Sequence, residues 1–102
     1  MEDHCDAINL VLEKGVVGEK YNIGGGEEIS NINLVKKILG YCNKDESVID
    51  YIKDRAGHDR RYAIDCSKIE KELGYKPKYD IEHGLEKTIK WRKSYLAANY
   101  KI

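Results

Sequence analysis

Apolar residues recur every three or four positions in four stretches of the chain, a spacing typical of amphipathic helices. The first stretch is followed by Gly15, a residue type favoured just after a helix end. Asn31 opens the second stretch, where its side-chain oxygen can accept the free amide hydrogens of a first turn. In the third, Ile69 and Leu73 are predicted to face inward. The predicted helices run over residues 2–14, from Asn31 to between residues 40 and 43, from Asp65 or Ser67 to Gly74, and from Asp80 onward.

Three other stretches alternate apolar and polar residues, which is the pattern of a half-buried strand. They are EKYNIG (residues 19–24), SVIDYIK (residues 47–53) and RYAID (residues 61–65). Two short strands make a poor sheet alone, because independent stability needs three or more strands or a covering helix. We therefore expect an α/β chain, an α+β-like and helix-rich lobe with two or three short strands, that forms part of something larger.

The composition restricts the class of protein. A chain of 102 residues is long enough for one domain with a modest core. Eighteen basic residues balance eighteen acidic ones, which argues against nucleic-acid or membrane-surface binding through the overall field. Cys5, Cys42 and Cys66 are widely spaced and form no CxxC pair, so we expect reduced thiols. With no apolar stretch of about 20 residues and an acidic N-terminus, we expect a cytoplasmic protein.

The glycine triplet in YNIGGGEEISN, residues 21–31, invites comparison with a dinucleotide-binding loop. The fingerprint GxGxxG has a third small residue, but Ile29 stands at that position when the motif starts at Gly24. The predicted helix begins only at Asn31, so its free amides cannot lie under a pyrophosphate at the turn. We interpret the triplet as a permissive tight turn, not as a cofactor loop.

The stretch DHCD, residues 3–6, brings four potential metal ligands together in the sequence. Adjacent residues on a helix point about 100° apart, whereas ligands to one ion need spacings of three or four residues. No metal site is therefore predicted.

Arginine is concentrated in one segment, KDRAGHDRRYAID, residues 53–65. Of the four arginines, Arg55, Arg60 and Arg61 fall within seven residues, whereas the lysines are spread along the chain. The planar guanidinium can bind two phosphate or carboxylate oxygens at once, which lysine cannot do. Gly57 permits close approach, and His58 adds a donor that can become charged near neutral pH. The segment is predicted to bind an anion.

The alternative interpretation of this segment is a solvated network of ion pairs between its arginines and the carboxylates of Asp54 and Asp59. Composition alone does not separate the two interpretations. Because a surface network of this kind stabilises a fold only slightly, the local choice of arginine favours the anion site.

The order of the motifs is similar to that of one known family. YNIGG, the helix after Asn31, DRAGHDRRYAID and SKIEKELGYKPKYDIEHGLEKTIKW resemble the C-terminal part of the dTDP-glucose 4,6-dehydratase family, from Glu2 to about Tyr95. This family belongs to the extended Rossmann-type short-chain dehydrogenases, in which an N-terminal domain carries NAD. The resemblance implies that residues 1–102 form a single C-terminal nucleotide-sugar-binding lobe, without the N-terminal NAD-binding Rossmann domain.

The resemblance also implies what the site does. In the intact enzyme, hydride passes from C4 of dTDP-glucose to NAD, water is eliminated across C5 and C6, and hydride returns to C6. The product, dTDP-4-dehydro-6-deoxyglucose, is a precursor of rhamnose and other deoxysugars. Arg55 and His58 match family positions that contact the nucleotide diphosphate, Asp54, Ala56 and Gly57 complete that loop, and Asn31 matches a further substrate-binding position.

Two departures from the family pattern affect the expected activity. Ala56 replaces the proline usual in the loop, which leaves the loop more freedom. No tyrosine is followed four residues later by lysine, so the family's Tyr-x-x-x-Lys pair is missing and we identify no catalytic residue. The chain alone is expected to be inactive and to bind no NAD, with a Rossmann lobe in trans as a candidate partner. The alternatives are a free-standing nucleotide-sugar binding module, a lobe of a related NDP-sugar epimerase or decarboxylase, and a decayed fragment.

Overall fold

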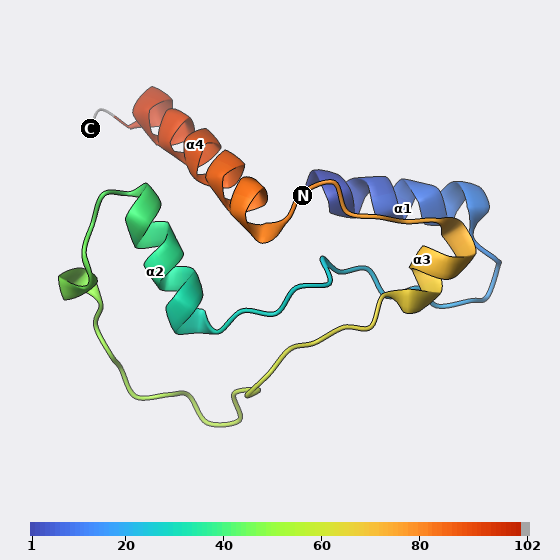
Figure 1. Ribbon diagram of the computed structural model, residues 1–102, viewed down its shortest axis with the longest axis horizontal. Coiled ribbons are helices and arrows are strands. Elements are labelled where there is room, and N and C mark those ends of the chain that lie inside the picture. Colours follow the sequence, from blue (N-terminus) through green and yellow to red (C-terminus); the bar gives the residue numbers. More distant parts are fainter. Residues whose placement is uncertain (101–102) are drawn as a thin grey trace. The chain divides into compact units, whose positions relative to one another are not determined.

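The computed structural model describes residues 1–100, and its regular elements there are all helical (Figure 1). By its internal contacts the chain forms two compact units. Unit 1 consists of Met1–Glu27 and Arg61–Asp80, and unit 2 of Glu28–Arg60 and the chain from Ile81. In chain order the elements are α1 (Glu2–Lys14), α2 (Asn31–Tyr41), the short 3-10 helix η1 (Glu46–Val48), α3 (Ser67–Leu73) and α4 (Ile81–Asn99).

The four predicted α-helices are confirmed, and α1 has the predicted bounds. Glycine is needed after α1 for a different reason from the usual left-handed cap. Gly15 has an extended backbone, and its N–H donates to the Val11 carbonyl at 2.8 Å. A Cβ at Gly15 would lie 2.4 Å from the same oxygen. Close approach of two backbone segments therefore excludes a larger side chain here.

The N-cap of the short helix α3 is Cys66, and not the predicted Asp65 or Ser67, whereas the predicted Gly74 does end the helix. The Asp65 carboxylate accepts the backbone N–H of Ser67 at 2.9 Å, which satisfies one free donor of the first turn. At the other end Gly74 is left-handed, with φ +71°. The Gly74 N–H donates to the Glu70 carbonyl at 3.0 Å, which is the bond of an αL C-cap, and the Tyr75 N–H donates to the Ile69 carbonyl at 3.4 Å.

Unit 1 contains a small core between α1 and α3, which lie side by side in Figure 1. Its buried residues are Ala7, Cys66, Ile69 and Tyr75. Ile69 is fully buried, as its predicted inward position requires. Leu10, Val11, Tyr21, Ile23 and Leu73 pack around this core.

Polar contacts tie the start of α1 to the segment after Pro77. The two carboxylate oxygens of Asp3 accept the backbone N–H groups of Lys78 and Tyr79, at 3.0 and 3.1 Å. These bonds, led by the one from Lys78, hold the pKa of Asp3 below its ordinary value. The Lys78 ammonium also pairs with Asp6 at 2.6 Å. Segments at opposite ends of unit 1's sequence are thus joined by one carboxylate and one ion pair.

The predicted strands are absent from residues 1–100, which corrects the α/β expectation. Over this range Figure 1 shows only helices and the irregular segments that connect them. Residues 47–53 begin with η1 and continue without regular structure, and residues 19–24 and 61–65 are likewise irregular. The described fold is a helical lobe, and not a helix-rich lobe with two or three short strands.

The alternation that suggested strands has a physical cause in unit 1. Tyr21 and Ile23 do face the core while Asn22 between them is exposed, so the backbone is extended there. Gly24 lies close to Ile64, but the hydrogen bond between these segments is donated by the side-chain amide of Asn22 to the Asp65 carbonyl at 3.5 Å. Alternation of buried and exposed side chains indicates an extended backbone. A strand also needs backbone N–H and C=O groups that pair with those of a neighbouring segment.

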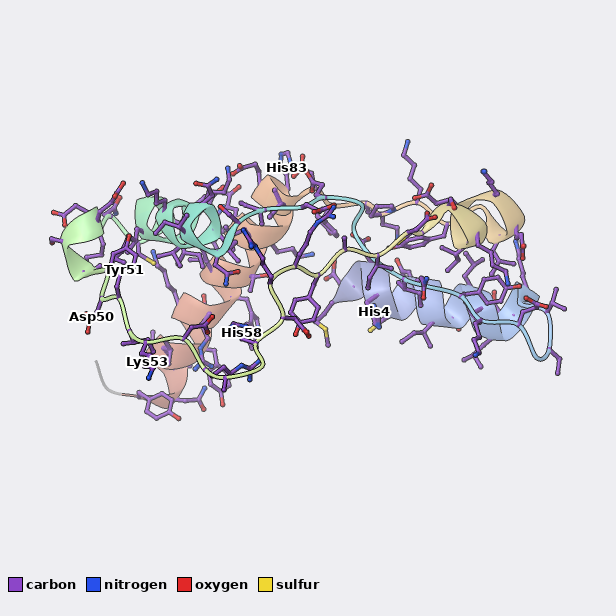
Figure 2. The ribbon with its side chains drawn as sticks, turned by 90° about the horizontal axis from the view of Figure 1, so that it is seen from below. His4, Asp50, Tyr51, Lys53, His58 and His83 are labelled. Carbon is purple, nitrogen blue, oxygen red and sulfur yellow. The ribbon has the colours of Figure 1, made fainter. Side chains whose placement is uncertain are left out.

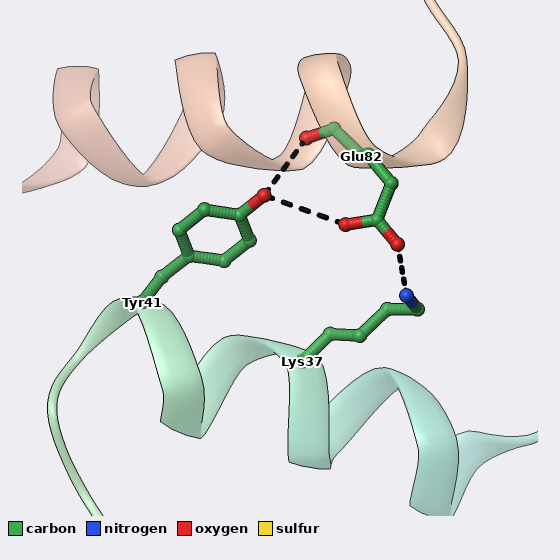
Figure 3. A network of polar contacts seen from close by, with 3 residues as sticks. All are labelled: Lys37, Tyr41 and Glu82. Carbon is green, nitrogen blue, oxygen red and sulfur yellow. Dashed lines mark hydrogen bonds and ion pairs between the residues drawn. The ribbon is translucent and has the colours of Figure 1, made fainter.

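Unit 2 pairs α2 with α4 (Figure 3). Lys37 on α2 forms an ion pair with Glu82 on α4, and the Tyr41 hydroxyl lies 3.4 Å from both the carboxylate and the backbone oxygen of Glu82. The Lys93 ammonium donates to the Tyr41 carbonyl at 2.8 Å. These polar contacts supplement apolar side chains that are only half-buried, such as Ile38. No residue among 28–60 and 81–100 is fully buried.

The N-cap of helix α2 lies one residue earlier than predicted. Ser30, and not Asn31, is the N-cap, and its hydroxyl accepts the Asn33 N–H at 3.4 Å. Serine and asparagine cap helices about equally well, so the sequence did not decide between two adjacent candidates. The helix ends at Tyr41, within the predicted region, and Asn43 follows in a left-handed conformation with φ +53°. Asn31 is therefore the first helical residue, and its side-chain amide is not used for capping.

Candidate functional site

Of the segment predicted to bind an anion, residues 53–60 lie in unit 2 and residues 61–65 lie in unit 1. It continues the chain after η1 as an exposed segment, on which Figure 2 labels Asp50, Tyr51, Lys53 and His58. Its side chains are not covered by apolar neighbours, and every residue from 50 to 60 is exposed. A ligand could therefore reach this segment directly.

One carboxylate organises the segment. Asp54 Oδ1 accepts the backbone N–H of Arg55 at 2.8 Å and lies 2.8 Å from Nδ1 of His58. The bond from His58, and then that from Arg55, keeps the pKa of Asp54 below its ordinary value. Asp54 is thus ionised at neutral pH and acts as an acceptor for both neighbours. The sequence placed Asp54 in the loop but did not reveal this contact, whose only signal was a spacing of four residues between Asp54 and His58.

A tight turn between Arg55 and His58 brings these contacts about. Ala56 and Gly57 form the turn, and Gly57 has φ +70°. A positive φ at the second turn residue alone is the signature of a type II turn, which requires glycine there and favours proline before it. A Cβ at Gly57 would meet no atom within 4 Å, so backbone conformation and not crowding demands glycine.

The predicted site residues fall into two groups. Asp54, Arg55 and His58 are brought together by the two hydrogen bonds of the Asp54 carboxylate. Asn31, at the start of α2, belongs to the same unit and is exposed, but within residues 1–100 no hydrogen bond connects it to the loop. Ser30 was not predicted as the N-cap. Because Ser30 caps α2, the side-chain amide of Asn31 is not needed for capping.

The glycine triplet belongs to unit 1, and its geometry does not fit NAD. Gly26 is left-handed, with φ +74°, and residues 27–30 follow before α2 begins at Asn31. A pyrophosphate is held when a helix N-terminus follows the glycine turn directly, which is not the case here. Gly24 instead allows the chain to approach the Cys66 thiol, from which a Cβ would be 3.1 Å away. Of the three glycines, only Gly24 lies against the unit 1 core, since an added Cβ at Gly25 or Gly26 would meet no atom within 4 Å.

Among residues 1–100, no three His, Cys, Asp or Glu side chains gather in a way that could hold a metal ion. None of the helices in that range is long and apolar enough to cross a membrane. Cys5, Cys42 and Cys66 are free thiols, of which Cys66 is buried in the unit 1 core.

Comparison with known proteins identifies the family. The sequence matches the family described as GDP-mannose 4,6 dehydratase over residues 1–88. The chain belongs to the GDP-mannose 4,6 dehydratase family. Within this family it is 47% identical over 100 residues to the dTDP-glucose 4,6-dehydratase of Xanthomonas campestris pv. campestris, which confirms the resemblance seen in the motifs. That alignment covers 89% of this chain and 28% of the relative.

Solved structures of family members agree. The NAD complex of dTDP-glucose 4,6-dehydratase from Bacillus anthracis superposes with a TM-score of 0.88 at 45% identity. DesIV, the dTDP-glucose 4,6-dehydratase of Streptomyces venezuelae with NAD and TYD bound, gives 0.89 at 43% identity. Each comparison covers 94% of this chain and 30% of the solved chain. This family member therefore spans about a third of the length of its relatives, and intact dTDP-glucose 4,6-dehydratases bind NAD.

Proposed function

We propose that this chain is the C-terminal, substrate-binding part of a dTDP-glucose 4,6-dehydratase. The whole enzyme would convert dTDP-glucose to dTDP-4-dehydro-6-deoxyglucose and water, in the biosynthesis of rhamnose and other deoxysugars. The observation that carries the proposal is the loop around Asp54, in which one carboxylate fixes both Arg55 and His58 beside a left-handed glycine. The identity of 43–47% to dehydratases of this name supports the same assignment.

The loop has the chemistry that a nucleotide diphosphate needs. Arg55 offers a planar fork of donors for phosphate oxygens, and His58 offers a further ring N–H. Gly57 removes side-chain bulk where the phosphates approach, while Asp54 and Ala56 hold the shape of the turn. Asn31, with its amide free of the capping role, would bind another part of the nucleotide sugar. The proposed substrate-binding residues are Asn31, Asp54, Arg55, Ala56, Gly57 and His58.

The remainder of the site would come from the other two-thirds of the enzyme. We propose that residues 1–102 form one C-terminal lobe and that an N-terminal Rossmann domain holds NAD and the catalytic acid, base and Tyr-Lys pair. NAD supplies a hydride acceptor and donor for the reaction when bound. The residues described here do not fit that cofactor, so their contribution is to bind and orient the sugar nucleotide. Three free thiols are consistent with a reducing compartment such as the cytoplasm.

The experiment that tests the proposal is a titration of the chain with dTDP and then UDP, followed by amide NMR and calorimetry. We expect dTDP-dependent shifts at Asn31, Arg55 and His58. Replacing Arg55 by alanine should weaken dTDP binding about 10- to 100-fold, because a charge-assisted hydrogen bond contributes roughly 1.5–3 kcal/mol.

The matched control is Arg92→Ala. Arg92 is the one arginine outside the segment, and its guanidinium lies 5.4 Å from the Tyr95 ring centre on α4. Its loss should leave dTDP binding unchanged. Equal losses for both variants would show that arginine acts only through net charge, and unperturbed amides at the loop would refute the proposal. Turnover of dTDP-glucose by the chain alone would refute the division of labour between the two lobes.

A further inference from the structure

The contact between Asp54 and His58 determines which ring nitrogen carries a proton. Nδ1 of His58 lies 2.8 Å from Oδ1 of Asp54, a normal hydrogen-bond distance. An ionised carboxylate has no proton to donate, so Nδ1 must be the donor. The low pKa of Asp54 keeps it ionised at neutral pH, and both groups remain accessible, with side-chain exposures of 33% for His58 and 77% for Asp54.

This bond restricts how the imidazole ring of His58 can contact a phosphate. A neutral imidazole carries a single N–H, and in His58 that N–H is already directed to Asp54. Its Nε2 then presents a lone pair, which repels a phosphate oxygen. Only the doubly protonated imidazolium can donate through Nδ1 to Asp54 and through Nε2 to a phosphate at the same time.

We propose that Asp54 is a positioning residue that makes binding of a nucleotide diphosphate depend on protonation of His58. The inference rests on the proposed function, in which His58 contacts the diphosphate. Binding then takes up one proton on Nε2 of His58 whenever the free chain holds the neutral ring. The bound diphosphate on one side and Asp54 on the other both stabilise the imidazolium that results.

The charges around His58 are compatible with this assignment. Within residues 1–100, the hydrogen bond and ion pair of His58 are formed with Asp54. Arg55 approaches Asp54 through its backbone N–H and not through its guanidinium, which stays available for the ligand. The other charged groups on the exposed residues 50–60 are those of Asp50, Lys53, Asp59 and Arg60.

The test uses dTDP-glucose as the probe. Its diphosphate is esterified at both ends and does not titrate near neutrality, whereas the terminal phosphate of dTDP has a pKa of about 6 and would itself exchange a proton. Calorimetry at pH 7.5 in two buffers of different ionisation enthalpy measures the protons taken up. Because a neutral His58 must gain a proton on Nε2 before it can donate to the diphosphate, we expect uptake of up to about one proton per ligand. Where binding takes up one proton, the affinity should fall by about tenfold for each unit by which the pH rises.

Three variants assign that proton. Asp54→Asn keeps an oxygen acceptor for Nδ1 but removes the charge, so the bend in the plot of affinity against pH should move to lower pH. Loss of repulsion between Asp54 and the phosphates would strengthen binding equally at every pH, which is why the position of the bend is the readout. His58→Gln keeps an N–H donor that does not titrate and should give a flat profile. The matched control, Asp50→Asn, removes another exposed carboxylate of the segment and should leave the bend in place.

The outcomes separate this inference from the proposed function. Binding of dTDP-glucose with no proton uptake, or a bend that persists in His58→Gln, would overturn the inference and leave the proposed function intact. A bend that does not move in Asp54→Asn would overturn the role of Asp54. No binding between pH 5.5 and 9 would overturn the proposed function and the inference with it. The wild-type measurement decides the proton uptake even if a variant fails to fold.

Discussion

At the scale of single residues, the loop depends on one backbone conformation. Gly57 adopts φ +70°, and Ala56 before it has no positive φ, as a type II turn requires. This turn reverses the chain between Arg55 and His58, so that the carboxylate of Asp54 can reach both. Alanine at the first turn position permits this conformation without enforcing it. Proline would fix φ near the value that the turn needs.

We therefore predict that Ala56→Pro tightens binding of dTDP. Restricting the free loop should contribute about 0.4–1 kcal/mol, because fewer conformations are lost when the loop is ordered. This corresponds to roughly a two- to fivefold lower Kd. The measurement is calorimetric titration of the wild type and the variant at one pH.

Gly57→Ala provides the opposite change in the same turn. A left-handed alanine costs roughly 1–2 kcal/mol, so dTDP binding should weaken. Gly25→Ala is the control, because Gly25 has neither a positive φ nor a neighbour within 4 Å of an added Cβ. If both turn variants bind as the wild type does, the turn observed here is not the conformation that binds.

At the scale of elements, α3 is held to α1 by few side chains. Ile69 is the largest fully buried side chain, in a core whose other buried members are Ala7, Cys66 and Tyr75. Ile69→Ala should lower the free energy of unfolding of unit 1 by about 2–5 kcal/mol, through lost burial and the cavity left behind. Leu12→Ala, on the exposed side of α1, should change it by less than about 0.5 kcal/mol. Denaturation followed by far-ultraviolet circular dichroism measures both, and equal effects would contradict the assignment of the core.

The link between α1 and the segment after Pro77 should depend on pH. The pKa of Asp3 is lowered in the folded chain by its bonds from the backbone of Lys78 and Tyr79. A depressed folded pKa contributes stability above the unfolded value of 3.8 and loses it as the pH falls through the folded value. Wild type should therefore lose stability below about pH 4, and Asp3→Asn should be less stable at pH 7 with a smaller loss on acidification. Thermal melts at pH 7 and pH 3 test this, and parallel losses in both proteins would assign the acid effect elsewhere.

The helices could be predicted from the sequence because their signals are local. The apolar spacing of α1, the carboxylate of Asp65 before α3 and the left-handed Gly74 after it each act within a few residues. The strands could not be predicted reliably, because pairing depends on a neighbour that no local pattern reveals. Tyr51 and Ile52 belong to an alternating stretch, yet both are more than 80% exposed. Their alternation corresponds to no packing within the described residues.

The candidate site was partly predictable for the same reason. Arginine clustering and the motif around Gly57 pointed to the loop, and its left-handed glycine is a local property. The bond between Asp54 and His58 depends on how the turn folds back, which the composition did not show. The roles of these residues toward a ligand remain predictions, to be tested by the titrations above.

At the scale of the whole molecule, the two units differ in what stabilises them. Unit 1 has a buried core, whereas residues 28–60 and 81–100 of unit 2 contain no fully buried residue. Large apolar side chains in unit 2 are exposed, among them Ile52 at 87% and Trp91 at 61%. Apolar surface left in water contributes nothing to folding, and the polar contacts between α2 and α4 are exposed pairs, which stabilise little. The relatives that this chain matches are about three times as long, and the additional length offers a means of covering this surface.

We predict that the two units open independently in the chain by itself. Amide hydrogen exchange followed by NMR should show stronger protection in α3, around Ile69 and Leu73, than in α2 and α4, because protection follows burial and local contact density. If the Asp54 loop binds a nucleotide diphosphate, dTDP should increase protection in unit 2 and leave unit 1 unchanged, since a ligand stabilises what it binds by mass action. Equal protection of α3 and α4 without ligand would mean that unit 2 has stabilising contacts beyond those described. A dTDP effect confined to unit 1 would place the ligand away from the Asp54 loop and direct attention to the glycine turn at Gly24–Gly26.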